Sequence, residues 1–505
     1  MRCRPPLQEP TLYQSIQFSH RPYVVQAYFC YARGTMSQTF FFYDLETSGL
    51  NAREARIMQF AGQRTDMDLN PIGEPYNILV KLSDDILPEP GAIMVTGITP
   101  QQTLTDGVSE ADFAKLLSEE IFTADTISLG FNSVRFDDEF IRHSLWRNFY
   151  DPYEWSWSDG RSRWDLLDVV RLVRALRPDG INWPVDDNGK AVNKLELIAK
   201  ENNLLHTKAH DALSDVEALI GVAKLIKTSQ PKMFEYLLQM RDKREVLKLV
   251  NLEDPRPFVY ASGRYDPAIE KTTVAFPITV GTKPGSLLVW DARHDPSAYL
   301  GANPQQLASI IFASREARAE EGFHSLPVKE LSPNKCPAVA PMGVLDTDTQ
   351  KRLKLDLAQI EQHIAVLVAH PEFGETLRTA YEMREPYESG SDVESQLYNG
   401  FGDKKDIPRM QAVRQANPEE LADFQPNFID ERLTQLLLRY KARNYPQSLS
   451  DDERRVWEEY RAHKLQSQLP RYLETLQKMS RGPFDQFLLE ELQLWAEAIV
   501  PVPDV

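Results

Sequence analysis

An aromatic run that ends in two carboxylates constrains the fold of this chain more than any other feature. Residues 39–47, TFFFYDLET, are aromatic and β-prone, which is typical of a buried strand. Side chains alternate between the faces of a strand, so Asp44 and Glu46 point to the same side. Two carboxylates this close repel each other unless a cation lies between them. The run predicts a divalent metal site, with Mg²⁺ or Mn²⁺ favoured by oxygen ligands, although surface turns also contain this pattern.

Two further acidic segments could complete this site. The run GFNSVRFDDEF predicts a strand end, a turn and a helix that starts near Asp137. An interaction with the helix dipole is the alternative for Asp137, Asp138 and Glu139, and one or two of them are expected to have that role. Asp137, directly after Phe136, is the favoured metal ligand. The run HDALSD places His210 in a loop and Asp215 one turn into a helix. Surface exposure of the histidine and capping by the aspartate are the alternatives for this segment taken alone.

The pattern along the chain predicts three successive domains, because 505 residues are too many for a single core. Strands and helices alternate first, which indicates an α/β domain. Short β-like runs separated by Pro, Gly and Asp come next, and helical runs end the chain. The expected parts are a disordered or artefactual extension at 1–36, an α/β domain with a mixed sheet at 37–230, a β-rich domain with terminal helices at 231–384 and a helical domain at 387–505.

Charge and cysteine content narrow the class of protein. The formal net charge of −17 argues against a generic nucleic-acid coat protein, but it leaves room for an enzyme with a local basic groove. No apolar run is long enough to predict a membrane span. The three cysteines are widely spaced and form no metal-ligand pattern, which fits a reducing cytosol. We therefore expect a cytoplasmic protein.

The three acidic segments, taken in order, resemble the DEDDh exonuclease superfamily. The D-x-E strand, the N-x-x-x-F-D turn and the H-x-x-x-x-D helix start are intact: Asp44, Glu46, Asp137 and Asp215 match the four acids, and His210 matches the histidine. From about Thr39 to the C-terminus the chain is similar to the bacterial exonuclease I family, through the stretches ITPQQ, FNSVRFDDEF, RNFYDPYEWSWSDGRSRWDLLDVVR, LRPDGINWP, NKCPAVA, QLYNGF and YKARNYP. This resemblance implies a ribonuclease H-like exonuclease domain, an SH3-like β-barrel domain and an all-helical C-terminal domain.

The resemblance also implies an activity. It is that of a 3′→5′ exodeoxyribonuclease that degrades single-stranded DNA to 5′-mononucleotides, in DNA repair and recombination. The four acids would hold two Mg²⁺ ions, with Mn²⁺ as a substitute, and His210 would take the proton from the attacking water. The implied partners are single-stranded DNA and the acidic C-terminal tail of single-strand DNA-binding protein, with Lys335 as a candidate contact. The chain is expected to act as a monomer.

Candidate substrate contacts combine one loop with interleaved basic and aromatic residues. The loop at 95–99, VTGIT, resembles the part of the superfamily that packs on the terminal nucleotide, and an ordinary turn is the alternative. Aromatic faces stack on unpaired bases, and basic side chains follow phosphates, although tryptophans are also common in protein cores. Lys194 stands where the family commonly has arginine. The set comprises Glu46, Thr96, Gly97, Ile98, Asn132, Arg142, Tyr153, Trp157, Arg171, Lys194 and Lys243.

Two other functions share these residues. An RNA 3′→5′ exonuclease would use the same catalytic set, but the chain length and the two additional domains favour DNA. A catalytically inactive scaffold that binds single-stranded nucleic acid would have no reason to keep crowded carboxylates. In the helical region, Arg432, Arg439 and Arg443 share one helix face. This face predicts either a wall of the DNA path or a solvated surface paired with local acids.

Overall fold

The structure, a computed structural model, describes residues 38–204, 212–385, 390 and 392–501. Its first strand, β1, is the central strand of a five-stranded sheet with the order β3-β2-β1-β4-β5. On one side β2 and β3 pair antiparallel, and on the other β4 and β5 pair parallel, so the expected mixed sheet is confirmed. The strands are β1 (Thr39–Thr47), β2 (Ile57–Thr65), β3 (Tyr76–Leu79), β4 (Thr126–Gly130) and β5 (Ser162–Asp165).

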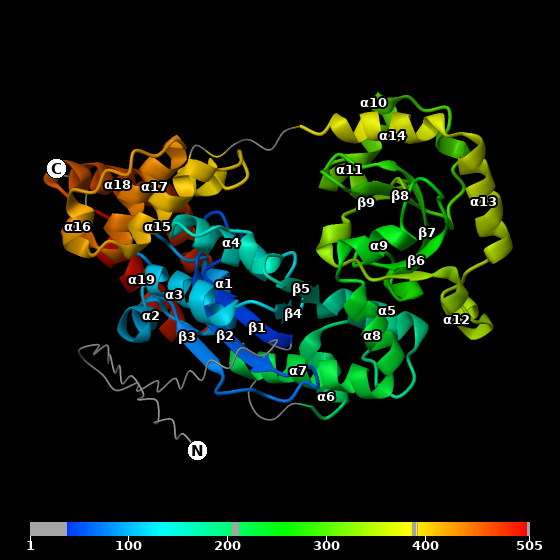
Figure 1. Ribbon diagram of the computed structural model, residues 1–505, viewed down its shortest axis with the longest axis horizontal. Helices are drawn as coiled ribbons and strands as arrows, with labels where there is room; N and C mark the ends of the chain where they lie inside the picture. Colours follow the sequence, from blue (N-terminus) through cyan, green and yellow to red (C-terminus); the bar gives the residue numbers. More distant parts are fainter. Residues whose placement is uncertain (1–37, 205–211, 386–389, 391, 502–505) are drawn as a thin grey trace, which may run out of the picture. The chain divides into compact units, whose positions relative to one another are not determined.

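Helices cover both faces of this sheet (Figure 1). In the described residues up to 250 the helices are α1 (Pro90–Thr96), α2 (Pro100–Asp106), α3 (Glu110–Leu116), the π-helix η1 (Leu117–Ile121), α4 (Asp137–Arg147), η2 (Glu154–Ser156), α5 (Leu166–Leu176), α6 (Leu195–Glu201), α7 (Ala212–Ser229), α8 (Pro231–Gln239) and α9 (Lys243–Leu249). Of these, α9 packs against the strands of the next sheet instead. Phe40 and Phe42 of β1 share a core with α5 and α7. Phe41, Tyr43 and Leu45 share a core with α3 and α4. Because side chains alternate along the strand, Asp44 and Glu46 continue the first set and face α7.

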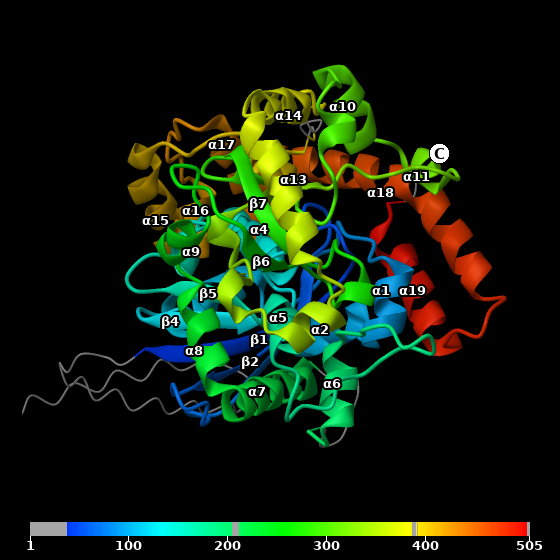
Figure 2. The ribbon, with the colours of Figure 1, turned by 90° about the vertical axis from the view of Figure 1, so that its right-hand side faces the viewer.

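A second sheet forms the middle of the chain. All its strands pair antiparallel in the order β10-β6-β7-β8-β9, as in a small barrel. The strands are β6 (Phe258–Ala261), β7 (Thr272–Val280), β8 (Leu287–Asp291), β9 (Val328–Leu331) and β10 (Val339–Pro341). Helices α13 and α14 lie beside β7 (Figure 2). The helices of this region are α10 (Pro304–Ile311), α11 (Arg315–Ala319), α12 (Thr347–Arg352), α13 (Leu357–Ala369) and α14 (Glu372–Glu382), with single turns η3 (Pro267–Ile269), η4 (Ser297–Tyr299), η5 (Pro333–Lys335) and η6 (Met342–Val344).

The described residues from 392 to 501 form helices only, which pack against the first sheet's helices. They are η7 (Val393–Gln396), η8 (Lys404–Asp406), α15 (Ile407–Gln415), α16 (Pro418–Ala422), α17 (Glu431–Asn444), η9 (Pro446–Ser448), α18 (Asp451–Met479) and α19 (Gln486–Ile499). One core joins α17 to Trp146 and Phe149, at the end of α4. Another joins α18 and α19 to Ile93 and Ile98, in and just after α1. The C-terminal helices thereby fix two segments that flank the candidate site.

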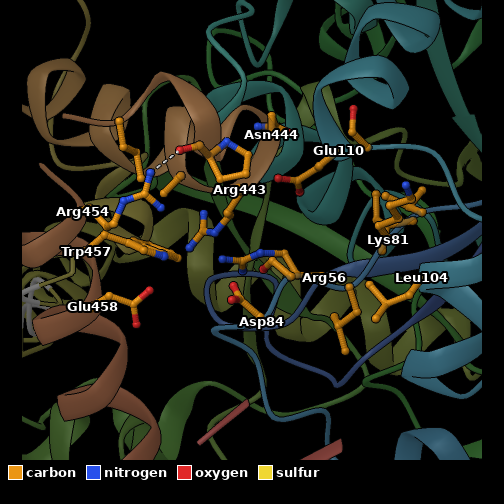
Figure 3. A pocket seen from close by; sticks show the side chains of 18 residues that line it. Arg56, Lys81, Asp84, Leu104, Glu110, Arg443, Asn444, Arg454, Trp457 and Glu458 are labelled. Carbon is orange, nitrogen blue, oxygen red and sulfur yellow. Dashed lines mark hydrogen bonds between the residues drawn. The ribbon is translucent and has the colours of Figure 1, made fainter. Parts of the chain in front are cut away.

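Buried ion pairs hold the same interface together. Arg443 of α17 donates to both carboxylate oxygens of Asp85, at 3.0 and 2.8 Å, and also to Glu394. Arg56 donates to the other oxygen of Glu394 at 2.5 Å. Figure 3 shows the Arg56 and Arg443 side chains beside a cavity of about 290 Å³ between the two regions. Although burial alone opposes ionisation, the surrounding cations lower the pKa of both Asp85 and Glu394, so both carboxylates stay charged.

This arrangement decides between the two interpretations of the arginine face on α17. Arg443 is 6% exposed at its side chain, Arg439 pairs with Asp392 at 2.5 Å, and Arg432 pairs with Asp430 at 2.6 Å. The face is therefore paired with acids, but Arg443 is buried and its acids Asp85 and Glu394 are distant in sequence. For Arg443, both the wall of a DNA path and the solvated surface are wrong. The helical period identified the face correctly, but it could not show that acids distant in sequence would cover it.

We expect Arg443→Met to lower the free energy of unfolding by about 3–5 kcal/mol, because it leaves buried carboxylates without their partner. Chemical denaturation measures this change. The matched control is Arg455→Met, because the pair of Arg455 with Asp452 is exposed. This substitution should change the free energy of unfolding by about 0.5 kcal/mol or less. Since the folded pKa values of Asp85 and Glu394 are lowered, their contribution is present at neutral pH and is lost as pH falls below about 4. Equal effects of the two substitutions would contradict this role.

Within the part of the chain that the structure describes, no helix is both long and apolar enough to cross a membrane. The expectation for residues 1–36 lies outside the described residues.

Candidate active site

Three of the predicted carboxylates meet at one point. Asp44 and Glu46 lie near the end of β1, and Asp215 lies in the first turn of α7. One carboxylate oxygen from each lies within 4.8 Å of the other two, and all three residues are partly exposed. The strand alternation that directs Asp44 and Glu46 toward α7 is the local cause of this meeting. The three acids can reach the same small cation.

Asp137 lies next to this cluster, after a turn whose backbone is hydrogen-bonded to the buried Asp165. The turn follows β4, and Asn132 adopts a left-handed backbone with φ of 68°. Asp165 accepts from the backbone N–H of Asn132 at 2.9 Å, of Val134 at 3.3 Å and of Leu167 at 3.0 Å. Burial, followed by the neighbouring Asp168, raises the pKa of Asp165 to about 6. Asp165 thus joins the turn before Asp137 to the start of α5.

Asp138, the acid next to Asp137, contacts the side chains of two other residues. Asp138 is buried, accepts from the Tyr43 hydroxyl at 2.6 Å and pairs with Arg163. Tyr43 is the β1 residue beside Asp44, so this contact connects the strand to α4 on the face opposite to the carboxylate cluster. The sequence pattern, which offered the helix dipole as the alternative role for the acids of this turn, did not reveal this link.

The electrostatics of the cluster favour a bound cation. Burial raises the pKa of Asp44 well above its usual value, and the negative charges of Asp137, Glu46 and Asp215 raise it further. Burial also raises the pKa of Asp137, with Asp138, Asp165 and Glu46 adding to the effect. A divalent cation would relieve this repulsion, and carboxylate oxygens are the donors that Mg²⁺ and Mn²⁺ prefer. The residues present therefore fit the implied metal ions.

His210 lies outside the described residues, as does the rest of 205–211. Its role stays a prediction from the sequence. Its position five residues before Asp215 connects it to the start of α7, which carries the third carboxylate of the cluster.

The predicted loop contacts lie at the end of α1. Gly97 caps this helix with a left-handed φ of 70°, which favours glycine, and it is exposed. The Thr96 hydroxyl accepts from the N–H of Ile98 at 3.2 Å. Ile98 is 7% exposed and packs in the core with α18 and α19. The loop thus has an exposed Gly97 next to the buried Ile98. Its contact with a nucleotide stays a prediction.

The other predicted contacts have different degrees of exposure. Arg142 is buried, donates to Glu139 at 2.7 Å and lies over the ring of Tyr153. Arg171 pairs with Asp168 at 2.5 Å. Trp157 is 66% exposed, in contrast to the buried Trp155 and Trp164, which belong to the core. Lys194 and Lys243 are exposed. No geometry here assigns these residues a substrate contact, and they stay predictions.

The role of one residue at the site could not be found from the sequence. Asp165 occurs in the run WDLLDVVRLVRAL, which predicts a helix. It is a recognisable helix cap, but its bond to the N–H of Asn132 is a contact across 33 residues.

Comparisons with known proteins agree with this architecture. Family models match in three consecutive segments: Exonuclease at 41–223, Exonuclease I SH3-like domain at 241–383 and Exonuclease I C-terminal domain at 391–499. Exodeoxyribonuclease I of Haemophilus influenzae is 38% identical over 442 residues, which cover 87% of this chain and 93% of the relative. Exodeoxyribonuclease I of Escherichia coli is 36% identical over 473 residues, which cover 92% and 99%.

Solved structures show the same likeness. The crystal structure of E. coli exonuclease I in complex with a dA16 oligonucleotide matches with a TM-score of 0.87 and 36% identity, over 92% of this chain and all of that one. The zinc ion bound form of the E. coli enzyme with single-stranded DNA matches equally, with a TM-score of 0.87. The mixed sheet and its acidic cluster therefore define a metal-dependent exonuclease. More narrowly, the chain belongs to the exonuclease I family, and it is an exodeoxyribonuclease.

Proposed function

We propose that this exonuclease degrades single-stranded DNA from the 3′ end, uses two Mg²⁺ ions and releases 5′-mononucleotides. The observation that carries the proposal is the meeting of Asp44, Glu46 and Asp215 within 4.8 Å, on a fold whose relatives include exonuclease I bound to oligonucleotides. Mn²⁺ has the same ligand preference and is the expected substitute. Single-stranded DNA is the proposed substrate because the relatives are exodeoxyribonucleases and the bound oligonucleotides are DNA.

The chain's own residues have distinct roles in this proposal. Asp44, Glu46, Asp137 and Asp215 would hold the metal ions, which when bound stabilise negative charge on the attacking and leaving oxygens. Asp165 would hold Asp137 in place by accepting from the N–H of Asn132 in the preceding turn. Asp138 would do so by accepting from the Tyr43 hydroxyl of β1. His210 would accept the proton of the attacking water. Thr96, Gly97 and Ile98 would contact the terminal nucleotide, while Asn132, Arg142, Tyr153, Trp157, Arg171, Lys194 and Lys243 would line the path of the strand.

Partners and setting are inferred from the family alone. We propose that the acidic C-terminal tail of single-strand DNA-binding protein binds this chain. Lys335 is a candidate contact, and it lies in η5 of the middle region. We further propose that the enzyme is monomeric and cytoplasmic and that it serves DNA repair and recombination.

A comparison of substrates tests the proposed specificity. Initial rates with Mg²⁺ are measured on single-stranded DNA, duplex DNA and single-stranded RNA of the same sequence. The expected result is rapid release of mononucleotides from the single-stranded DNA and slow release from the other two. Equal rates on RNA and DNA would instead indicate a general single-strand exonuclease.

A further inference from the structure

Tyr398 comes from the C-terminal region but lies against the helix that carries Asp137. Its ring centroid is 6.1 Å from that of His143, edge-on, and 6.4 Å from that of Tyr153. Its hydroxyl donates to Oε2 of Glu139, two residues after Asp137 on α4. The residue is nevertheless 45% exposed. Tyr398 is therefore held in one orientation while much of its surface faces solvent.

A cavity of about 200 Å³ lies beside this ring. One wall contains Leu50, which is four residues after Glu46, and another contains Phe136, which directly precedes Asp137. The residues that line the cavity thus include near neighbours in sequence of two proposed metal ligands. Its volume is below the range of about 300–1,000 Å³ that encloses larger ligands, and it suits a single planar group.

The charges around the cavity suit an anionic strand. Arg53 and Arg135 line it, and Glu139 is the one carboxylate among its lining residues. Both oxygens of Glu139 are engaged, since Arg142 donates to Oε1 at 2.7 Å and Tyr398 to Oε2. Burial and the charge of Glu139 raise the pKa of Tyr398, so its hydroxyl remains a donor at neutral pH. Arg135 also pairs with Asp168 at 3.5 Å, although its side chain is 46% exposed. A strand that reaches this cavity meets basic side chains, an aromatic face and an acid that is already neutralised.

We propose that Tyr398 stacks on an unpaired base of the bound strand, with the base received by this cavity. Stacking on an aromatic face tolerates every base, as an enzyme that degrades any sequence requires. The inference rests on the proposed function, because it assumes a single-stranded substrate. Tyr398 is then a positioning residue that the C-terminal region supplies to the exonuclease domain.

Two variants separate the ring from the hydroxyl. Tyr398→Leu keeps apolar bulk without an aromatic face, and Tyr398→Phe keeps the ring without its bond to Glu139. Phe487→Leu is the matched control, since Phe487 is 63% exposed on α19 and outside the residues that line this cavity. Binding of a labelled oligothymidylate is measured in EDTA, with strands that lack one base at each of the first few positions from the 3′ end. KM and kcat are then measured with Mg²⁺.

The expected result is specific to one position of the strand. The wild type should lose about tenfold in affinity when one particular base is missing. Tyr398→Leu should bind the intact strand about tenfold more weakly than the wild type does. Removal of the base at that position should not weaken its binding further. Its KM should be raised and its kcat nearly unchanged. Tyr398→Phe and Phe487→Leu should behave as the wild type, and all variants should melt alike.

Three results would overturn this assignment. The first is that Tyr398→Leu binds the intact strand as tightly as the wild type does. The second is that the missing base weakens binding by Tyr398→Leu as much as it weakens binding by the wild type. The third is that Tyr398→Phe and Tyr398→Leu lose affinity equally. The last would mean that the bond to Glu139 supports the fold. Failure of the wild type to bind or degrade the strand would refute the proposed function itself, which is a separate outcome.

Discussion

Asp44→Asn and Asp215→Asn should each reduce the rate of mononucleotide release by about 10³-fold or more. Metal ions contribute several kcal/mol to stabilisation of the transition state, and each 1.36 kcal/mol lost is about tenfold in rate. Both substitutions remove one carboxylate from the cluster whose oxygens lie within 4.8 Å. Initial rates on single-stranded DNA with Mg²⁺ measure the effect. Asp187→Asn, in an exposed loop, is the matched control and should keep the wild-type rate.

Stability without metal gives an independent readout. Burial and neighbouring carboxylates raise the folded pKa of Asp44, so the metal-free protein loses stability as pH rises from the unfolded value of about 3.9 toward the folded one. At neutral pH, Asp44→Asn should therefore melt higher than the wild type in EDTA. Added Mg²⁺ should raise the melting temperature of the wild type more than that of the variant. A variant that melts lower in EDTA and still cleaves DNA would show that Asp44 is structural.

His210→Ala should reduce the cleavage rate by about 10²–10⁴-fold, while binding of single-stranded DNA in EDTA is unchanged. A general base must be unprotonated to accept a proton. The wild-type rate should therefore fall as pH drops below about 6.5, the usual pKa of histidine, and this limb should be absent in the variant. His206→Ala, four residues earlier in the same segment, is the matched control. A near-wild-type rate at neutral pH for His210→Ala would exclude it as the base.

The periodic features of the fold were predictable from the sequence. The two-residue period of β1 correctly placed Asp44 and Glu46 on one side, and the mixed sheet followed from the order of strands and helices. The start of α7 carries Asp215, as the run HDALSD predicted, although each acidic segment taken alone also had a structural alternative. These features depend on backbone geometry that acts over a few residues.

The contacts that fix the site were not predictable, because they join residues far apart in sequence. Arg56 and Glu394 are separated by 338 positions, and Glu139 and Tyr398 by 259. A helical period finds that Arg443 shares a face with Arg439, but it does not say which acids will cover that face. The same holds for Arg142, since the sequence does not show that its side chain lies over the ring of Tyr153.

The most direct test of the central claim follows one single-stranded DNA with its label at either end, with Mg²⁺ or with EDTA. A metal-dependent 3′→5′ exonuclease should turn a 3′-labelled strand at once into labelled mononucleotide. The 5′-labelled strand should instead become a ladder of shortening products, and neither reaction should proceed in EDTA. Immediate release of mononucleotide from the 5′ label, internal cuts as first products or unchanged cleavage in EDTA would contradict the account.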